Sequence, residues 1–468
     1  MELTRENKMG TMKTTRLLFS MSVPIIISML VQALYNIVDS IFVAGFNSIE
    51  GTGALTLAFP IQNLLLAVSL GLSVGVNALL SRSLGQRNLE KVNLIAGQGF
   101  FLIATGYILF LIFGIFFVDM YSVSQSAGND LLRQYSTDYL SVVCIGSISV
   151  FVQVLAERLL QATGRSFLSM ITQGVGAIVN IILDPIFIFG VQPLGIPSMG
   201  VLGADIATVI GQAVAAVIGI IFNIVYNKEI KILIKNFIPR LAVIKEILGI
   251  SIPSVLMQAI GTIMTLCMNM ILISFSEIAM NVFGVYFKLQ SFILMPIFGL
   301  NNGMVPILSF NYGAGKPKRV FSTMKIAYIT AISYAVFGCL LFQIFPSALL
   351  SMFQAGEEML AIGSVALRIM STSFLLAGFS IISISTCQAL GKSIFALFVS
   401  VGRQLVVLIP VAYLLSLTRK IELVWWAFPI AELMSVLLSA IFLMITIKSV
   451  FNYKNEEAMT KTEEVANG

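Results

Sequence analysis

The sequence contains no histidine and few charged residues. Of its 468 residues, 11% are charged and 58% are hydrophobic, whereas a soluble domain is typically about 45–50% apolar and about 25% charged. This composition excludes a water-soluble enzyme. The absence of imidazole also excludes histidine-based acid–base catalysis and histidine-ligated zinc or haem, so any proton binding must fall to carboxylates.

Cysteine is equally scarce. The four cysteines lie far apart inside apolar stretches, with no CxxC pair and no zinc-ligand spacing: Cys144, Cys267, Cys339 and Cys387. They indicate neither a disulfide framework nor a metal centre, and we interpret them as packing residues of helices.

Long apolar segments dominate the chain. A spanning helix needs about 20 apolar residues, so the roughly 270 hydrophobic residues suffice for about ten to thirteen spans. Twelve segments are found, at residues 17–44, 52–80, 92–118, 133–160, 166–190, 197–226, 241–273, 280–308, 319–346, 360–388, 394–417 and 422–447. The first is too long for a signal peptide and lacks a cleavage site. The sequence therefore predicts an all-α polytopic membrane protein with twelve transmembrane helices.

Lysine and arginine gather in alternate loops. One set of loops, together with both termini, holds nearly all of them, while the other set holds Arg133, Arg419 and Lys420 among acidic residues. Because cytoplasmic loops are enriched in Lys and Arg, both termini are expected in the cytoplasm. The net charge of +6 is thus a topology signal, and we expect no nucleic-acid partner.

The chain contains an internal repeat. Residues 59–92 match residues 287–320 at 10 of 34 positions, and the segments around Pro24 and Pro253 follow the same offset of about 228 residues. Each half holds six spans, so the halves are parallel repeats related by a pseudo-two-fold axis along the membrane normal. We expect two six-helix lobes with a V-shaped central cleft, which is transporter architecture.

The expected domains follow from these spans. They are a cytoplasmic N-terminus at 1–16, an N-lobe at 17–226, a cytoplasmic amphipathic linker at 227–240, a C-lobe at 241–447 and a disordered cytoplasmic tail at 448–468. The glycine-containing turns at 164–166 and 391–393 lack the full GxxxxGK[ST] pattern, so we expect no ATP and an ion gradient as the energy source.

Acidic residues inside the predicted spans are few. A charge at the centre of a spanning helix costs about 2.5–3.5 kcal/mol, which makes each one a functional hypothesis. Asp39 and Asp184 both lie about 9 Å below the predicted outer surface, and Asn180 precedes Asp184 by one turn. Such carboxylates can bind H⁺ or Na⁺, or can simply bond neighbouring hydroxyls. Asp205 lies near that depth and could instead cap its helix.

The second half inverts this charge pattern. Lys288 and Arg403 are cations within its spans, and Glu432 is the acid. We predict a structural ion pair of Glu432 with Arg403 or Lys288, the alternative being a direct substrate or coupling role. Neutral polar residues line the same helices: Gln258, Gln290, Gln388 and Gln404.

Three stretches resemble a known family. Residues 180–190 (NIILDPIFIFG) resemble the fifth-helix signature of multidrug and toxic compound extrusion (MATE) transporters, in the branch of DinF-like and MepA-like bacterial exporters. Residues 203–212 are similar to the sixth-helix opening, and residues 427–432 also fit. The resemblance covers about residues 15–447. It implies a proton- or sodium-coupled antiporter that exports amphipathic, often cationic compounds by alternating access.

The resemblance also implies roles for particular residues. Asp39, Asn180 and Asp184 match the family's cation site, which would hold Na⁺ if the coupling ion is a metal, and Pro24 matches the proline of a bending first helix. Gln212 matches a polar position of the cavity. We extend the predicted cavity to Asp205, Gln258, Lys288 and Arg403, although relatives usually have a small apolar residue where Asp205 stands.

Sodium-coupled members of another branch carry acidic residues in helices 7 and 10 that this chain lacks, which favours H⁺ over Na⁺. We expect a monomer in the bacterial inner membrane, with small amphipathic organic substrates and no cofactor. The main alternative is a lipid-linked precursor flippase of the same superfamily, to which Lys288 and Arg403 give some weight. A non-transporting scaffold is a third reading, which the buried carboxylates disfavour.

Overall fold

The structure is nearly all helical. The computed structural model describes the backbone of residues 7–45, 49–126, 129–191, 195–353 and 355–466, and their side chains except at 36, 37, 39–41, 43–45, 49–52, 234 and 451–466. Within this part, twelve helical segments are long and apolar enough to cross a membrane. The predicted polytopic all-α fold is therefore confirmed.

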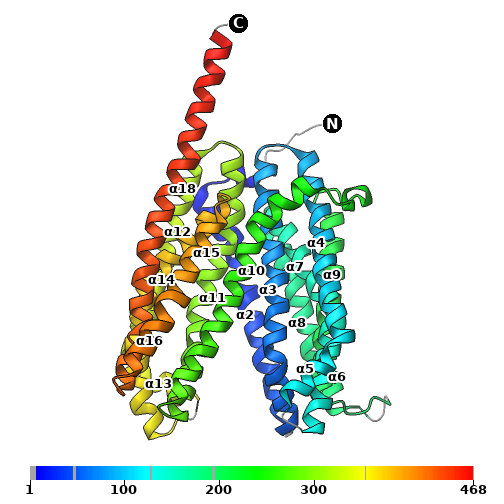
Figure 1. Ribbon diagram of the computed structural model, residues 1–468. Coiled ribbons are helices and arrows are strands. Elements are labelled where there is room, and N and C mark those ends of the chain that lie inside the picture. The colour runs from blue at the N-terminus through cyan, green and yellow to red at the C-terminus, as the bar shows by residue number, and fades with distance from the viewer. Residues whose placement is uncertain (1–6, 46–48, 127–128, 192–194, 354, 467–468) are drawn as a thin grey trace. The chain divides into compact units, whose positions relative to one another are not determined.

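The helices follow one another with short connections (Figure 1). In the first half they are α1 (Lys8–Thr11), α2 (Thr14–Gly45), α3 (Ile49–Gly85), α4 (Leu89–Phe116), α5 (Val118–Gln125), α6 (Asp130–Gly146), α7 (Ile148–Ala162), α8 (Ser166–Phe189) and α9 (Val201–Val225). In the second half they are η2 (Ile234–Phe237), α10 (Leu241–Ile273), α11 (Glu277–Gly313), α12 (Pro317–Ile344), α13 (Pro346–Ser351), α14 (Glu357–Ala389), α15 (Ser393–Val401), η3 (Gly402–Leu408), α16 (Ile409–Ser416), α17 (Ile421–Val424) and α18 (Ala427–Ala466).

Two spans are interrupted in their interior, and the twelfth joins α17 to α18 near its beginning. The fourth span consists of α6 and α7, which meet at Ser147, and the eleventh runs from α15 through η3 to α16. The element η3 is a π-helix, a rare form that is frequently found at functional sites. Both interruptions lie inside apolar stretches, where the hydrophobic pattern is continuous and does not reveal them.

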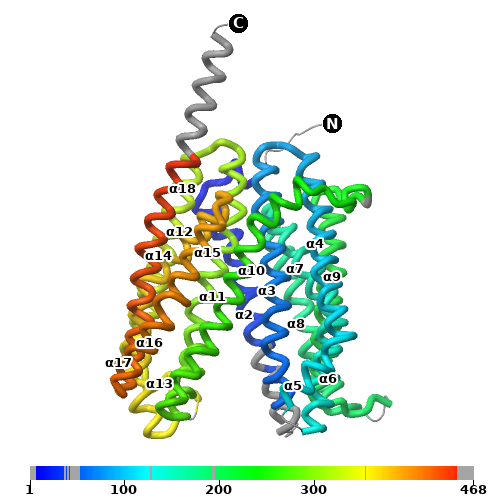
Figure 2. The backbone as a smooth tube through the Cα atoms, in the orientation of Figure 1, coloured from blue at the N-terminus to red at the C-terminus, as the bar shows by residue number. Residues whose placement is uncertain are grey.

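The chain forms two compact units. Unit 1 consists of Met1–Lys8 and Phe19–Ala259, and unit 2 of Met9–Leu18 and Ile260–Gly468. In unit 1, α3 packs against α4, α6 and α7, and α8 packs along α9. In unit 2, α14 packs against α11, α12 and α18 (Figure 2). The linker at 227–240 lies wholly within unit 1. The tail at 448–468 falls largely outside the described side chains, so its disorder stays a prediction.

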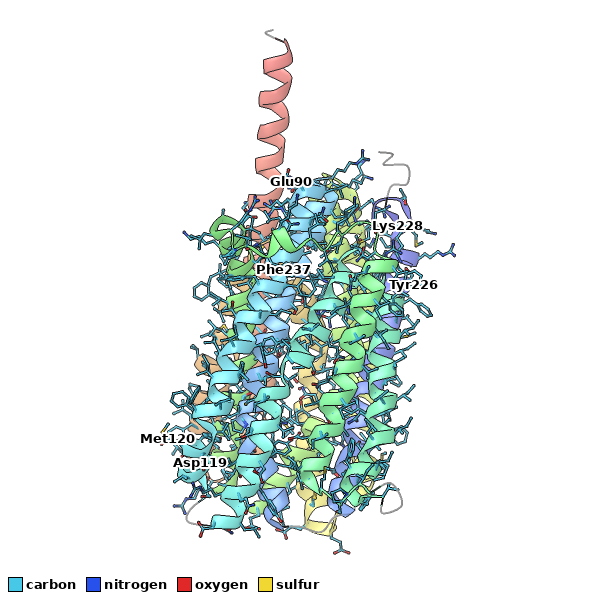
Figure 3. All side chains as sticks on the ribbon, turned by 90° about the vertical axis from the view of Figure 1, so that its right-hand side faces the viewer. Glu90, Asp119, Met120, Tyr226, Lys228 and Phe237 are labelled. Carbon is cyan, nitrogen blue, oxygen red and sulfur yellow. The ribbon has the colours of Figure 1, made fainter. Side chains whose placement is uncertain are left out.

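The two ends of unit 1 differ in composition. Figure 3 shows Glu90, Tyr226 and Lys228 toward one end, and Asp119 and Met120 toward the other. The first end carries the loops in which lysine and arginine gather, as expected for a membrane protein with alternate basic loops. At the other end, Arg133 forms an exposed ion pair with Asp119 at 2.8 Å.

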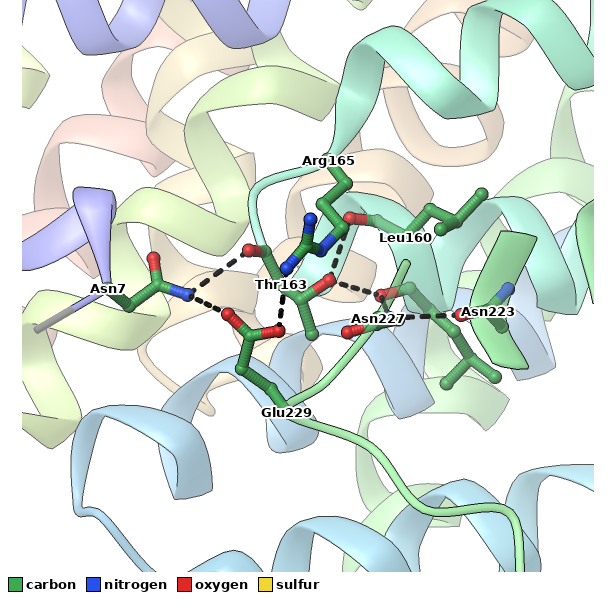
Figure 4. Close-up of polar contacts among 8 residues, drawn as sticks. Asn7, Leu160, Thr163, Arg165, Asn223, Asn227 and Glu229 are labelled. Carbon is green, nitrogen blue, oxygen red and sulfur yellow. Dashed lines mark hydrogen bonds and ion pairs between the residues drawn. The ribbon is translucent and has the colours of Figure 1, made fainter. Parts of the chain in front are cut away.

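A polar cluster closes the basic end of unit 1 (Figure 4). Asn7 Nδ2 donates to the carbonyl oxygen of Thr163 and to Glu229 Oε1, both at 3.2 Å. Arg165 Nη2 lies 3.1 Å from Glu229 Oε2. The N-terminal segment, the turn after α7 and the chain after α9 are therefore held together by one carboxylate.

Lys8 lies beside this cluster and is half-buried. Burial lowers the pKa of Lys8, the charge of Arg165 lowers it further, and the charge of Glu229 opposes the shift. The positively charged form of Lys8 is therefore disfavoured next to Arg165.

Candidate functional site

Small residues allow α8 and α9 to approach closely. A Cβ atom built on Gly211 would lie 2.7 Å from the carbonyl oxygen of Gly176, and one built on Gly176 would lie 2.8 Å from Ala215 Cβ. Larger residues would push the two backbones apart, since Cβ contacts below 3.0 Å essentially do not occur. The sequence of small residues thus decides which polar side chains of the two helices can meet.

The close approach joins Asn180 and Asp184 on α8 to Thr208 on α9. Asn180 Nδ2 donates to Asp184 Oδ1 at 3.1 Å and to Thr208 Oγ1 at 3.2 Å. Asn180 is 3% exposed and Asp184 is fully buried. Asn180 Oδ1 has no hydrogen-bond partner within the described part of the chain. The site therefore offers a buried carboxylate and a buried amide oxygen.

Pro185 adds a further acceptor to this region. It lies inside α8 directly after Asp184. Because proline has no N–H, the carbonyl oxygen of Ile181, four residues earlier, lacks its usual intrahelical donor. Carboxylate, amide and carbonyl oxygens are ligands that suit a proton or a hard cation such as Na⁺.

Helix α2 flanks the site. Gln173 Nε2 of α8 donates to Gln32 Oε1 of α2 at 3.0 Å, and the rings of Phe42 and Phe189 meet edge-on at 6.3 Å. These two contacts bracket Asp39 on α2 and the Asn180–Asp184 pair on α8. The side chain of Asp39 lies outside the described residues, so its part in the site stays a prediction. No three His, Cys, Asp or Glu side chains among those described could hold a metal ion together.

Asp205 lies on another side of α9. The N-cap residue of α9 is Gly200, so Asp205 does not cap this helix. It is buried and interacts electrostatically with Cys144 of α6, and Val209, one turn later, lies over Gly146. Asp205 therefore faces α6, whereas Gly211 and Ala215 face α8.

The predicted cavity residues of unit 1 have different surroundings. Gln212 stands one turn after Thr208 and is partly buried, and Gln258 of α10 is exposed. Neither side chain forms a hydrogen bond within the described part of the chain. Pro24 is buried inside a continuous α2, where Ser28 Oγ donates to its carbonyl oxygen at 3.1 Å.

Unit 2 contains one buried ion pair among its described residues. Arg403 Nη1, in the π-helix η3, donates to Glu432 Oε2 of α18 at 3.0 Å. The side chain of Glu432 is 6% exposed and that of Arg403 is 35% exposed. Of the two predicted partners of Glu432, the structure thus brings Arg403 to it. Lys288 is exposed, with its Nζ 6.0 Å from the centre of the Phe353 ring.

Sequence reasoning missed two polar residues of unit 1. Thr208 was not singled out, although it stands in the stretch 203–212 and binds Asn180. Glu157 is a buried carboxylate of α7 that accepts a hydrogen bond from Gln153 at 3.0 Å. It lies within the predicted span 133–160 but is not among the predicted site residues, and α7 continues past it to Ala162.

Twelve spans around a buried polar site are typical of a membrane transporter. The MatE family model matches residues 24–186 and again residues 253–414, which together are more than half of the chain. The protein belongs to the MatE family. The second match begins 229 residues after the first, in agreement with the internal repeat.

Relatives and solved structures agree with this assignment. The chain is 27% identical over 433 residues to the multidrug export protein MepA of Staphylococcus haemolyticus, with 92% of each chain covered. It is 26% identical over 412 residues to MepA of Staphylococcus aureus, covering 88% of this chain and 89% of that one. An outward-facing multidrug resistance MATE family transporter has the same fold, with a TM-score of 0.87, 22% identity and coverage of 96% and 99%.

Proposed function

We propose that this protein is a proton-coupled antiporter that exports amphipathic, often cationic organic compounds by alternating access. The observation that carries the proposal is the buried cluster of Asn180, Asp184 and Thr208 between α8 and α9. Two relatives of nearly equal length that are multidrug export proteins support the substrate class.

The cluster fits a coupling role because a proton that binds to a buried carboxylate removes its negative charge. A charge buried inside the membrane is costly, so this step changes the free energy of the site strongly. In the outward-facing state, H⁺ binds at Asp184 and Asp39 and displaces the cationic substrate. The hydrogen bonds of Asn180 then rearrange, and α2, which carries Pro24, bends. After the change to the inward-facing state the proton leaves and a new substrate binds.

Na⁺ is the second candidate ion at this site. The buried Asn180 Oδ1 lacks a hydrogen-bond partner among the described residues and is a suitable oxygen ligand. The oxygens of Asp184 and the carbonyl of Ile181 would complete part of its coordination. We favour H⁺ because the described part of α10 and α14 provides no further embedded carboxylate for a second cation site.

A flippase for lipid-linked precursors fits less well. Such a function would use a strongly cationic cavity for phosphate groups. The charge of Arg403 is compensated by Glu432 at 3.0 Å, and Lys288 lies over the Phe353 ring. The relatives named above are multidrug exporters, which also favours drug export.

The test is ethidium efflux from vesicles under imposed proton or sodium gradients. We expect a proton gradient alone to drive efflux, and Asp184→Asn to abolish it with unchanged expression. Asp138→Asn, an exposed acid of α6, is the matched control and should behave as the native protein. Efflux that survives in Asp184→Asn would disprove the coupling site, and efflux driven by sodium alone would assign Na⁺.

The location in the cytoplasmic membrane, with both termini inside the cell, is part of the proposal. It is supported by the alternation of basic loops. Reporter fusions at the connection after Phe116 and at residue 228 should report opposite sides of the membrane.

A further inference from the structure

The segment between α9 and α10 is bound to the side of α4. We call residues 228–241 the linker strip. Gln98 Nε2 of α4 donates to the carbonyl oxygens of Asn236 at 2.7 Å and Ile238 at 2.8 Å, and its Oε1 accepts from the backbone N–H of Arg240 at 2.9 Å. One buried glutamine thus holds three points of the strip, which is an ordered structure and not a loose connection.

Two further contacts fix the strip along α4. The backbone N–H of Lys231 donates to Asn93 Oδ1 at 2.6 Å, and the rings of Phe100 and Phe237 lie 5.5 Å apart. A Cβ atom at Gly97 would lie 2.4 Å from the carbonyl oxygen of Asn236, so only glycine admits the strip there. The backbone of the strip is therefore accommodated by the surface of a spanning helix.

These contacts set the depth of the strip. Asn93 and Gln98 stand four and nine residues after Leu89, where α4 begins, so the strip runs along about the first 13 Å of a membrane-spanning helix. Figure 3 shows Phe237 at about the level of Tyr226, which follows α9, and nearer the middle of unit 1 than Glu90 in the first turn of α4. A spanning helix meets the lipid headgroups near its ends, so the strip is expected close to the boundary between headgroups and acyl chains.

The strip carries surplus positive charge. The side chains of Lys231, Lys235 and Arg240 are exposed and form no ion pair within the described part of the chain. Glu229, the acid within the strip, pairs with Arg165 at 3.1 Å, and Glu246, the first acid after it, pairs with Lys91 at 2.7 Å. Neither acid therefore offsets the charge of these three cations.

The strip also exposes large apolar side chains. Ile238 is 67% exposed and Leu241 is 72% exposed, next to Arg240. At the level of the headgroups, apolar side chains can enter the acyl boundary while long basic side chains reach the phosphates. The strip therefore matches the two layers of a membrane interface.

We propose that the linker strip is a binding site for anionic phospholipid headgroups in the leaflet that faces this end of unit 1. Lys231 and Lys235 act as point charges toward the phosphate, and the guanidinium of Arg240 binds its oxygens in bidentate fashion. Gln98 acts as a positioning residue, because it holds the backbone next to Lys235 and at Arg240 against α4.

The test uses the full-length protein in nanodiscs of phosphatidylcholine alone or with added phosphatidylglycerol. The readouts are the number of phosphatidylglycerol molecules retained in native mass spectrometry and the shift of the melting temperature that this lipid causes. Each cation near an anionic surface contributes about fivefold to lipid enrichment. The triple variant Lys231→Gln, Lys235→Gln, Arg240→Gln should therefore lose at least about tenfold in apparent affinity for phosphatidylglycerol.

The matched control neutralises three cations of unit 2 that are expected on the same side of the membrane, Lys318→Gln, Lys392→Gln and Lys448→Gln. It should respond to phosphatidylglycerol as the native protein does. Equal retention in the triple variant and the native protein, or an equal loss in the control, would overturn the proposal. If the triple variant does not fold, two other variants decide the question. The double variant Lys231→Arg, Lys235→Arg must retain the lipid, and Gln98→Leu must weaken lipid binding. Neither readout depends on transport.

Discussion

Ser81 donates a hydrogen bond from Oγ to the carbonyl oxygen of Ala162 at 3.1 Å, and the same relationship recurs in unit 2 between Ser309 and Ala389 at 2.9 Å. Ala162 ends α7 and Ala389 ends α14, so both carbonyls belong to the last turn of a helix and have no intrahelical donor. The turns that follow are also alike, since Gly164 and Gly391 have φ of 86° and 84°. The internal repeat is thus preserved down to single hydrogen bonds.

Ser81→Ala and Ser309→Ala should each lower the free energy of unfolding by about 1 kcal/mol, because each leaves a buried carbonyl oxygen without its donor. Melting in detergent measures the effect. Ser274→Ala serves as the control and should change nothing, because Ser274 is an exposed residue just after α10 whose hydroxyl donates to the nearby carbonyl oxygen of Ile271. Effects of very different size at the two serines would argue against equivalent roles.

Gly211→Ala should separate α8 from α9. Its Cβ atom would lie 2.7 Å from the carbonyl oxygen of Gly176, and such overpacking costs about 1–3 kcal/mol. The same change should weaken efflux, because Asn180 and Thr208 no longer meet. Gly174→Ala on α8 is the control, since nothing lies within 4 Å of its Cβ atom. A Gly211→Ala protein with native melting temperature would show that the helix contact is not tight.

Arg403→Met should destabilise unit 2 by about 3 kcal/mol, because it leaves the buried carboxylate of Glu432 without its partner. The double variant Arg403→Met, Glu432→Met should recover most of this loss, since it removes both charges together. A double-mutant cycle by thermal melting measures the coupling. If the double variant transports normally, the pair has a structural role; if it is stable and inactive, the pair takes part in transport.

Lys8→Met should change how stability depends on pH. Burial and Arg165 hold the pKa of Lys8 below its value in the unfolded chain, so between these two pKa values the unfolded state binds more protons and stability rises with pH. The methionine variant should lose this rise and should be somewhat more stable at neutral pH. Lys13→Met, at an exposed position, is the control. A native pH profile in Lys8→Met would contradict the burial of this amine.

Much of the fold could be predicted because its determinants are local. Spanning segments need about 20 apolar residues each, and the twelve predicted segments agree with the twelve observed ones within a few residues at most ends. The interruptions at Ser147 and at η3 could not be predicted, since neither breaks the apolar pattern. They depend on whether neighbouring helices provide hydrogen-bond partners for the backbone groups that lose their intrahelical partner at the interruption.

The candidate site was predictable in part. Asn180 and Asp184 stand one turn apart on a helix, so their contact follows from helical spacing. Thr208 could not be chosen from the sequence, because its approach depends on the glycines that bring α9 against α8. Glu157 lies inside the predicted span 133–160, and its burial could not be predicted because it depends on the helices that pack around α7.

The sequence by itself determined the membrane class, the number of spans, the repeat and the scarcity of embedded carboxylates. These properties follow from the amino-acid composition and from the internal sequence repeat, and neither depends on contacts between residues far apart in the chain. Only the tertiary structure decided that Glu432 pairs with Arg403 and not Lys288, that Asp205 faces α6, and that Gln98 holds the linker strip. Such choices join residues far apart in the chain, so they depend on how the helices pack and on which side chains are small enough to let them approach.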